Sequence, residues 1–449
     1  MNPVSASAAH SVRQYLARHA APEVAWAEAI SERYRAALVV PAYLEAPGLL
    51  ERYRLALASA PGRVLVIVVV NAAQANAERS WHVHRDLLAD LRGSSARSLG
   101  SEPCWLARHP HADVLVIDRA HPDRCFPDRQ GVGLARRIGC DLALALHARG
   151  RLEDPFIYCT DADAELPAGY FEAALQQPGA AAVLFSFWHE PGIDAAIDAA
   201  TAVYELGLRY YVEGLAAAGS PFAYHSIGST LGVQAAAYAA VRGFPKRLAG
   251  EDFYLLNKLA KVGALLRVDS VCVRLASRAS LRTPHGTGAA AVEIAGLERL
   301  DSAPFYHPGI FPLLGLWIGA LGEFARTRQL SRVRAGLVRR AGSAAVALEA
   351  VLDELAVWPA LEQAARHCHG ETALALRLHT WFDAFRTLKF VHALRAHGWA
   401  SVPFREALEA SRWFSAERAR HAPVAELRRS LLEREALRSV SLGILSAAP

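Results

Sequence analysis

Residues 155–163 read PFIYCTDAD, an apolar run that ends in two aspartates separated by one alanine. The consecutive apolar residues 156–159 predict a short strand covered on both faces, because a half-exposed strand would alternate apolar with polar residues. Asp161 and Asp163 follow where this strand ends. Two carboxylates so close together repel one another unless a cation lies between them. The stretch therefore predicts a buried sheet with an acidic site at its edge.

Further runs between residues 36 and 278 have the same apolar character. They are rich in β-branched residues and alternate with longer segments of helical spacing. The strand-like runs cover residues 36–43, 63–73, 112–120 and 181–190, and the helical segments cover residues 47–60, 132–148 and 167–176. This alternation predicts an α/β fold, a three-layer Rossmann-like domain with a mostly parallel sheet. Such domains bind ligands at the carboxyl ends of their strands, where Asp161 and Asp163 lie.

The chain changes character near residue 304. Beyond this point apolar residues recur at helical spacing and strand-like runs disappear. We therefore expect three parts: an N-terminal helical extension (1–34), the α/β domain (35–303) and a helical C-terminal domain (304–449). The longest uncharged apolar stretch, Gly309–Gly322, is shorter than the ~20 residues that span a bilayer and predicts a buried helix.

The composition of the 449-residue chain is that of a soluble globular protein, with 53% hydrophobic and 21% charged residues. Its net charge of +5 comes almost entirely from arginines interspersed with acids, so we expect no nucleic-acid partner. The six cysteines form no C-x-x-C pair and no secretory signal is visible, which together predict a cytoplasmic protein. The arginines between Arg326 and Arg340 predict either a solvated helix face or peripheral contact with the anionic inner face of a membrane.

Asp161 and Asp163 suggest two kinds of role. In extended backbone, side chains two residues apart point to the same side, so one divalent cation would bridge both carboxylates. Hard oxygen ligands favour Mg²⁺ or Mn²⁺, whose coordination is usually completed by water and substrate phosphates. The alternative is a turn in which the aspartates bond to nearby backbone N–H groups.

A second acidic pair, Glu251 and Asp252, follows Gly250 at the predicted start of a helix. Acids at this end cap free N–H groups and oppose the helix dipole. The other interpretation is that one of them is a general base that takes a proton from an acceptor hydroxyl. Neighbouring residues point about 100° apart around a helix axis, so only one of the two is expected to face a pocket.

Two glycine-containing stretches are weaker signals. Gly131 and Gly133 precede a helix that carries Arg136, but their spacing matches neither G-x-G-x-x-G nor a P-loop. The segment around His285, SRASLRTPHGTG, suggests either a phosphate-facing loop or an ordinary flexible connection.

The order of these motifs resembles a known family. VVPAYLE, VIVVVNA, GVGLARRIGCDLA, CTDAD and GFPKRLAGEDFYLLNKL follow one another over residues 35–288 as in the family-2 glycosyltransferases of the GT-A fold. The resemblance implies an enzyme that uses Mn²⁺ or Mg²⁺ to move one sugar from a nucleotide-diphosphate sugar to a hydroxyl acceptor, either a small molecule or a lipid-linked one. The pattern favours inversion of the anomeric centre.

The resemblance also implies a role for each matching residue. Asp163 would be the main metal ligand, and Asp161 would contact the ribose or the metal. Asp252 would be the catalytic base, with Glu251 binding the acceptor or supporting the turn. The remaining matches are Pro41, Tyr43 and Glu45 in the nucleoside pocket, Arg136 near the base or phosphates, and His285 as a further metal ligand.

Two departures from the family pattern limit this interpretation. Asn71 stands in the nucleoside pocket where the family usually carries an acid that reads uracil, so the nucleotide stays open. A Q-x-x-R-W motif is missing, which argues against a processive synthase. The alternatives are a retaining GT-A enzyme, a sugar-phosphate nucleotidyltransferase, which would need a glycine-rich N-terminal loop, and an inactive nucleotide-sugar-binding or membrane-associated scaffold.

Overall fold

The computed structural model describes residues 3–100, 103–280, 286–438 and 441–442, and the chain divides into two compact units. Unit 1 takes in the described residues of Met1–Pro191 and Ser226–Ser277, together with Gly286. Unit 2 takes in Gly192–His225, Arg278–Ser280 and the described residues from Thr287 onward. Each unit is considered by itself below.

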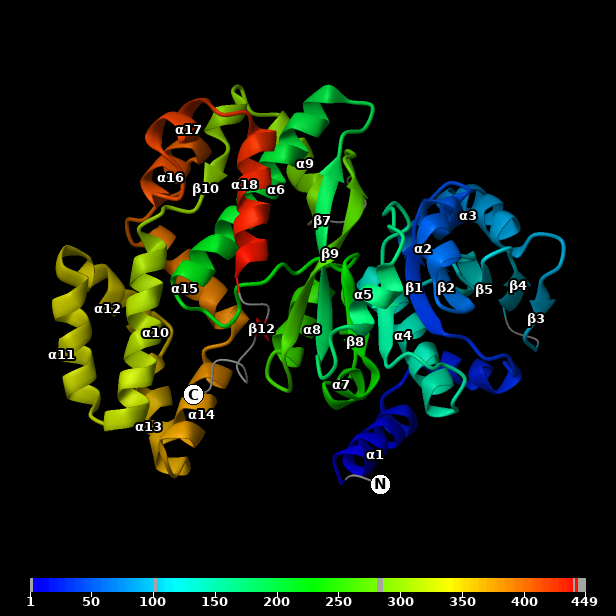
Figure 1. Ribbon diagram of the computed structural model, residues 1–449, viewed down its shortest axis with the longest axis horizontal. Helices are drawn as coiled ribbons and strands as arrows, with labels where there is room; N and C mark the ends of the chain where they lie inside the picture. The colour runs from blue at the N-terminus through cyan, green and yellow to red at the C-terminus, as the bar shows by residue number, and fades with distance from the viewer. Residues whose placement is uncertain (1–2, 101–102, 281–285, 439–440, 443–449) are drawn as a thin grey trace. The chain divides into compact units, whose positions relative to one another are not determined.

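Unit 1 is built on one mixed sheet with the strand order β9-β7-β8-β6-β1-β2-β5-β4-β3 (Figure 1). The strands are β1 (Ala36–Ala42), β2 (Val64–Asn71), β3 (Arg97–Ser98), β4 (Cys104–Arg108), β5 (Ala112–Arg119), β6 (Phe156–Cys159), β7 (Ala182–Glu190), β8 (Leu231–Gln234) and β9 (Leu265–Ala276). Strands β6, β1, β2 and β5 run parallel, as do β7 and β9. Strand β8 is antiparallel to β6 and β7, and β4 to β5. The predicted mostly parallel α/β fold is confirmed.

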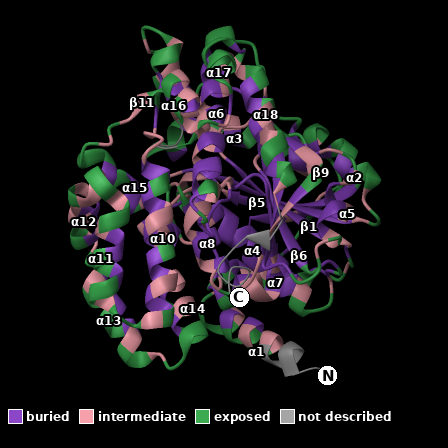
Figure 2. Ribbon diagram, turned by 60° about the vertical axis from the view of Figure 1, so that its left-hand side comes forward, coloured by how far each residue is buried: buried purple, intermediate pink, exposed green. Residues whose placement is uncertain are grey.

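The sheet of unit 1 is covered on both faces, as its continuous apolar strands require. Every residue of β1 and β2 is buried (Figure 2). One face packs in a single core with α2 (Arg54–Ser59), α3 (Ala77–Arg92) and α5 (Tyr170–Leu175). On the other face α4 (Val132–Ala148) approaches so closely that a Cβ on Gly139 would lie 2.4 Å from the Val39 side chain. These three layers place the carboxyl ends of β1, β2 and β6 at one edge.

The N-terminal segment is tied to α4 by a buried carboxylate. Asp141 accepts hydrogen bonds from the Tyr15 hydroxyl at 2.6 Å, the Tyr238 hydroxyl at 2.7 Å and the Ala21 N–H at 2.7 Å. These bonds satisfy a carboxylate that is fully inaccessible, which is the condition for burying such a group. The remaining helical elements of unit 1 are α1 (Pro3–Arg18), η1 (Pro22–Ala29), η2 (Leu49–Tyr53), η3 (Gln74–Asn76), η4 (Pro122–Arg124), α7 (Ala235–Ala240) and α8 (Glu251–Leu259).

Unit 2 is helical apart from short β-strands, and the predicted helical character of the C-terminal region is confirmed. The unit also takes in Gly192–His225, which falls within the range expected for the α/β domain. Its helices are α6 (Ala195–Ala217), α9 (Thr287–Ala295), α10 (Ile310–Thr327), α11 (Leu330–Ala341), α12 (Ala345–Glu354), α13 (Val357–His367), α14 (Glu371–Trp381), α15 (Ala384–Ala396), α16 (Phe404–Ser411), α17 (Ala416–His421) and α18 (Val424–Leu437), with η5 (Leu300–Ser302) and η6 (Gly342–Ala344). Its strands are β10 (Pro304–Phe305), β11 (Val402–Pro403) and β12 (Ser441–Leu442). The expected buried helix is α10, whose Trp317 is fully enclosed. Across the described residues, no helix has the length and hydropathy of a membrane span.

Helices α6 and α18 of unit 2 are joined by buried ion pairs. Arg209 bonds to Glu205 at 2.8 Å on its own helix and to Glu435 of α18 at 2.9 Å. Arg428 of α18 bonds to Glu205 at 2.5 Å, and His225 contacts Glu435 at 3.0 Å. The side chains of the two arginines and two glutamates are at most 6% exposed. The positive charges of the two arginines are thus balanced by the negative charges of the two glutamates in a buried environment.

Candidate active site

The guanidinium of Arg136 gathers three sequence motifs into one cluster. Arg136 lies near the start of α4 and its side chain is 3% exposed. One terminal nitrogen pairs with the Asp161 carboxylate and the other donates to Glu251 Oε1 at 2.9 Å. Asp161 follows β6 and Glu251 begins α8. Residues 25 and 115 positions away from Arg136 in the chain therefore share one cation.

Gly133, in the first turn of α4, determines how this cluster is held. A Cβ on Gly133 would lie 2.5 Å from the carbonyl oxygen of Pro245, closer than real Cβ contacts allow. The N–H of Gly133 donates to the Arg247 carbonyl at 3.1 Å. The start of α4 thus packs directly on the backbone that leads into α8. Gly133 serves this close approach, which fixes Arg136 relative to Glu251.

Gly228 is a residue that the sequence analysis missed. A Cβ at this position would lie 2.3 Å from Nη1 of Arg136, so only glycine leaves room for the guanidinium. Gly228 lies in the HSIGST segment between α6 and β8. Burial raises the pKa of Asp252, and a hydrogen bond from the backbone of Gly228 partly opposes this rise. No recognised motif contains Gly228, so the sequence held no signal for its role.

The backbone from Asp161 to Ala164 is a turn and not the extended segment assumed from the sequence. Strand β6 ends at Cys159, and the Ala164 N–H donates to the Asp161 carbonyl at 3.1 Å. The Tyr53 hydroxyl donates to the same carbonyl at 2.9 Å and anchors the turn. The extended interpretation of the two aspartates was therefore wrong, and the backbone forms a turn, which was the alternative. Aspartate and small residues favour a turn here because they tolerate its backbone angles.

The two aspartates of the turn nevertheless lie close to one group. Burial raises the pKa of the Tyr53 hydroxyl well above its usual value, and the charges of Asp163, Asp161 and Glu45 raise it further. Three carboxylates thus act on a single buried hydroxyl. A hard divalent cation is commonly held by one or two protein carboxylates plus substrate phosphates, so Asp161 and Asp163 remain the candidate ligands. Within the described ranges no group of three or more His, Cys, Asp or Glu side chains converges as a metal cage. His285 lies outside the described residues.

Helix α8 begins at Glu251, directly after Gly250 with φ +72°, as the sequence predicts. Burial raises the pKa of the Glu251 carboxyl to about 7, although Arg136 opposes the shift. Burial also raises the pKa of Asp252, again opposed by Arg136. The half-buried Asp252 accepts a hydrogen bond from the N–H of Phe253 at 2.7 Å. Both acids therefore belong to the electrostatic surroundings of Arg136.

The cluster contains more negative than positive charge. Asp161, Glu251 and Asp252 all interact with Arg136, so three carboxylates face one guanidinium. Removing charges from water is costly unless they are paired, and the unmatched acids must either bind a proton or attract a cation. Burial raises the pKa of Glu251 to about 7, so this acid binds a proton more readily than usual. The arrangement combines a carboxyl that binds a proton near neutral pH with further carboxylates whose negative charge attracts cations.

The residues expected in a nucleoside pocket lie at the ends of neighbouring strands. Pro41 is buried near the end of β1, next to β2, which ends with Asn71. Asn71 is 5% exposed, and its Oδ1 has no hydrogen-bond partner among the described residues. Tyr43 and Glu45 are half-buried, and Leu44 between them has φ +56°, a backbone angle that is strained for leucine and typical of functional loops. The structure thus brings these four candidates to the carboxyl edge of the sheet.

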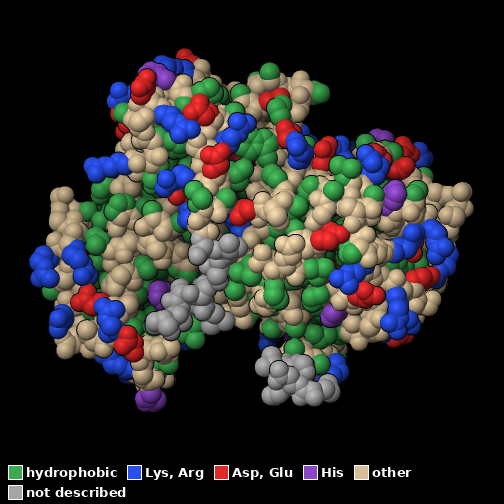
Figure 3. Space-filling model, in the orientation of Figure 1, with side chains coloured by type: hydrophobic (Ala, Val, Ile, Leu, Met, Phe, Trp, Pro, Cys, Tyr) green, Lys and Arg blue, Asp and Glu red, His purple; other side chains and the backbone are tan. Residues whose placement is uncertain are grey.

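The arginine-rich segment of unit 2 is partly committed to internal contacts. Arginine and lysine side chains gather over the α11 and α13 region of the face shown in Figure 3. Arg328 donates to the carbonyls of Ala365 and Cys368, at 3.0 and 2.8 Å. Arg334 pairs with Glu349 and Arg340 with Glu323, at 2.8 and 3.2 Å. A membrane contact for this face stays a prediction.

Comparison with known proteins gives no family assignment. No family model and no curated protein matches the chain. Among solved structures, it is similar to GalNAc-T7 with UDP, GalNAc and Mn²⁺, at 10% identity and a TM-score of 0.31. That match covers 59% of this chain and 48% of the other, so the chain spans about half the length of GalNAc-T7.

A second similar structure is residues 1–349 of S. aureus TarS in complex with UDP-GlcNAc. The identity is 11% and the TM-score 0.32, over 70% of this chain and 87% of the other. At such TM-scores the likeness carries no functional conclusion. The function must be inferred from the residues of the chain itself.

Proposed function

We propose that the chain is a metal-dependent glycosyltransferase that moves one sugar from a nucleotide-diphosphate sugar to a hydroxyl acceptor. The observation that carries the proposal is the acid-rich cluster around Arg136, where Asp161, Glu251 and Asp252 meet at the carboxyl edge of the sheet. Ligands of α/β sheets bind at this edge. The motif order of the sequence supports the same function.

In this proposal Asp163 and Asp161 would hold Mn²⁺ or Mg²⁺ at the donor site. When bound, the metal supplies positive charge that stabilises the leaving diphosphate. Arg136 keeps Asp161 in place through their ion pair and limits repulsion between the acids. Pro41, Tyr43, Glu45 and Asn71 form the nucleoside pocket, where the unpaired Oδ1 of Asn71 accepts a hydrogen bond from the base.

Asp252 is the proposed general base. Its carboxylate accepts the proton of the acceptor hydroxyl while the hydroxyl oxygen forms a bond to the anomeric carbon and the bond to the diphosphate breaks. Attack from the side opposite the leaving group inverts the anomeric configuration. Glu251, bonded to Arg136, holds the start of α8 in position so that Asp252 stays within the cluster. The half-buried position of Asp252 fits a base that meets its substrate from solvent.

Thermal denaturation of the full chain tests this function. A panel of nucleotide-sugars is added with Mn²⁺ and with EDTA, and a donor at 100 times its Kd is expected to stabilise the chain by ~2.7 kcal/mol. Asp163→Ala should remove both the metal-dependent shift and the sugar transfer detected by mass spectrometry. The matched control is Asp86→Ala, an exposed aspartate on α3, which should behave like wild type.

The outcomes separate the alternatives. Stabilisation by donors that EDTA and Asp163→Ala leave unchanged would contradict the metal assignment. Metal-dependent donor binding without transfer to any acceptor, and without hydrolysis, would favour a nucleotide-sugar-binding scaffold. Release of diphosphate from a nucleoside triphosphate and a sugar phosphate would favour a nucleotidyltransferase.

A further inference from the structure

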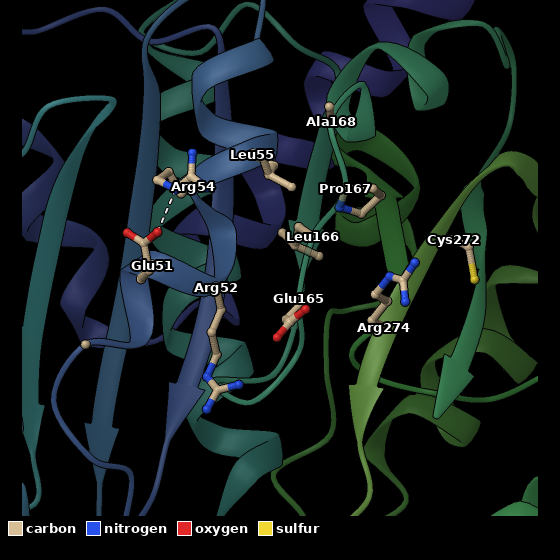
Figure 4. A pocket seen from close by; sticks show the side chains of 11 residues that line it. Glu51, Arg52, Arg54, Leu55, Glu165, Leu166, Pro167, Ala168, Cys272 and Arg274 are labelled. Carbon is tan, nitrogen blue, oxygen red and sulfur yellow. Dashed lines mark hydrogen bonds and ion pairs between the residues drawn. The ribbon is translucent and has the colours of Figure 1, made fainter. Parts of the chain in front are cut away.

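Unit 1 contains a cavity of about 590 Å³ that is open to solvent, lies beside the acidic turn and shares no residue with the Arg136 cluster. Its volume falls within the range of ~300–1,000 Å³ that is typical of small-molecule sites. Three segments line it (Figure 4): the start of η2 and α2, the chain after the acidic turn, and β9. The lining residues are Gly48, Glu51, Arg52, Arg54, Leu55, Glu165, Leu166, Pro167, Ala168, Cys272 and Arg274.

The charges of this cavity are balanced. Arg54 pairs with Glu51 at 2.6 Å. Arg274 pairs with Glu190, which lies next to the lining. Arg52 and Glu165 remain, and neither side chain takes part in an ion pair within the described part of the chain. An anionic ligand would therefore be attracted by Arg52 and repelled by Glu165. A cationic ligand would be attracted by Glu165 and repelled by Arg52.

Arg52 and Glu165 are complementary in hydrogen bonding. The guanidinium only donates and the carboxylate only accepts, whereas a hydroxyl does both. Figure 4 shows the Glu165 carboxylate directed toward the part of the cavity where the Arg52 guanidinium lies. A neutral ligand with several hydroxyls would satisfy both groups at once.

An apolar wall faces these two polar groups. Leu55 and Pro167 line the cavity on the side away from the Arg52 guanidinium in Figure 4, whereas Leu166 beside them is 2% exposed and packs in the core of the unit. Leu55 is 52% exposed, so part of its apolar surface is available to a ligand. A sugar ring presents C–H groups on its faces and hydroxyls on its rim, and matches both parts of the lining.

The cavity is also connected to the acidic turn through the backbone. The Leu166 N–H donates to the Arg52 carbonyl at 3.2 Å. Tyr53, which follows Arg52 in the chain, donates a hydrogen bond from its hydroxyl to the Asp161 carbonyl at 2.9 Å. A ligand held by Arg52 and Glu165 therefore lies against the segments that hold the turn of Asp161 and Asp163.

We propose that this cavity is a binding site for a neutral saccharide unit, separate from the site of the nucleotide-sugar. The assignment rests on the cavity and its lining alone. Taking the bound unit as a sugar of the acceptor rests in addition on the proposed transferase function.

Saturation-transfer NMR on the full chain tests the site, with maltose, cellobiose, lactose and di-N-acetylchitobiose as probes. Leu55→Trp places a larger side chain in the cavity from an exposed position and should abolish the saturation-transfer NMR signal of the bound saccharide. Val262→Trp, at another partly exposed apolar position of unit 1, is its matched control and should keep the signal. Glu165→Gln and Arg52→Gln should each weaken binding about tenfold, whereas Glu78→Gln and Arg79→Gln on α3 should not.

Three results would overturn the proposal: no probe binds the wild-type chain, binding survives Leu55→Trp, or glucose 1-phosphate and octanoate bind where neutral sugars do not. Donor binding is measured on the same variants by thermal shift. Saccharide binding without a donor shift would contradict the transferase function but not the site. A donor shift without saccharide binding would contradict the site alone.

Discussion

Arg136 in unit 1 and Arg209 in unit 2 are both almost inaccessible, and each bonds to two carboxylates. Their surroundings differ in charge balance. Arg428 also pairs with Glu205, so two arginines match Glu205 and Glu435 in a network whose charged side chains are at most 6% exposed. It joins two helices and leaves no charge unmatched.

Around Arg136 the acids outnumber the cation, and the cluster is open to solvent on one side. The Asp161 side chain is 41% exposed, and burial raises the pKa of Glu251 to about 7. An arrangement built for stability alone would match its charges, because an unmatched buried charge destabilises the fold. The two arginines therefore differ in charge balance and in exposure to solvent, which is the difference expected between a structural ion network and the proposed active site.

The largest effect is expected from Asp252, which tests whether the open cluster is catalytic. Asp252→Asn should lower kcat by ~10²–10⁴, the usual contribution of a general base, with donor affinity nearly unchanged. The coupling constant of the anomeric proton should show inversion in the wild-type product. Retained configuration, together with near-normal turnover of the variant, would exclude Asp252 as base and inversion as mechanism.

The second prediction compares the two arginines directly. Arg209→Met should lower the free energy of unfolding by ~3–5 kcal/mol, because it leaves buried glutamates without their partner. Arg136→Met should cost less, since Glu251 is able to take up a proton when the cation is lost. Urea denaturation of both variants at pH 6 measures the difference. An equal or larger loss for Arg136→Met would show that its cluster is as structural as that of Arg209.

The third prediction concerns the space that Gly228 leaves for Arg136. Gly228→Ala places a Cβ against the guanidinium and should destabilise unit 1 by ~1–3 kcal/mol, the usual cost of overpacking. Transfer activity should fall as well, because Asp161 and Glu251 lose their shared partner. The control is Gly319→Ala in α10, where a Cβ meets nothing within 4 Å. Unchanged stability of Gly228→Ala would mean that the Arg136 side chain can adopt another conformation without loss of stability.

The sequence predicted the sheet better than the site. Strands β1 and β2 were recognisable because all their residues are apolar, as a strand covered on both faces requires. Strand β8 has only four residues and contains a glycine. Strand β9 carries exposed charges such as Asp269, so neither strand gave the same signal. A local pattern is readable only where burial is continuous.

The candidate site depends on contacts that no local pattern encodes. The pairing of Arg136 with Asp161 and Glu251 joins residues that are far apart in the chain. The role of Gly228 depends on where that guanidinium lies, and the role of Tyr53 on where the acidic turn lies. The acids and the start of the helix at Glu251 were predictable from the sequence. The position of Arg136 between Asp161 and Glu251 was visible only in the folded structure.

The smallest effect is a pH dependence of stability that comes from Glu251. Its pKa is about 7 in the folded chain against an ordinary value of 4.5, so between these two pH values the folded state keeps a proton that the unfolded state has released. Stability should therefore fall as pH rises from about 4.5 to 7 and level off above, by ~1.4 kcal/mol for each unit of pKa shift. Glu251→Gln removes the titrating group and should flatten this part of the profile relative to wild type. Denaturation at pH 5, 6 and 7.5 measures the slope, and the same slope in wild type and variant would show that Glu251 does not carry this pH dependence.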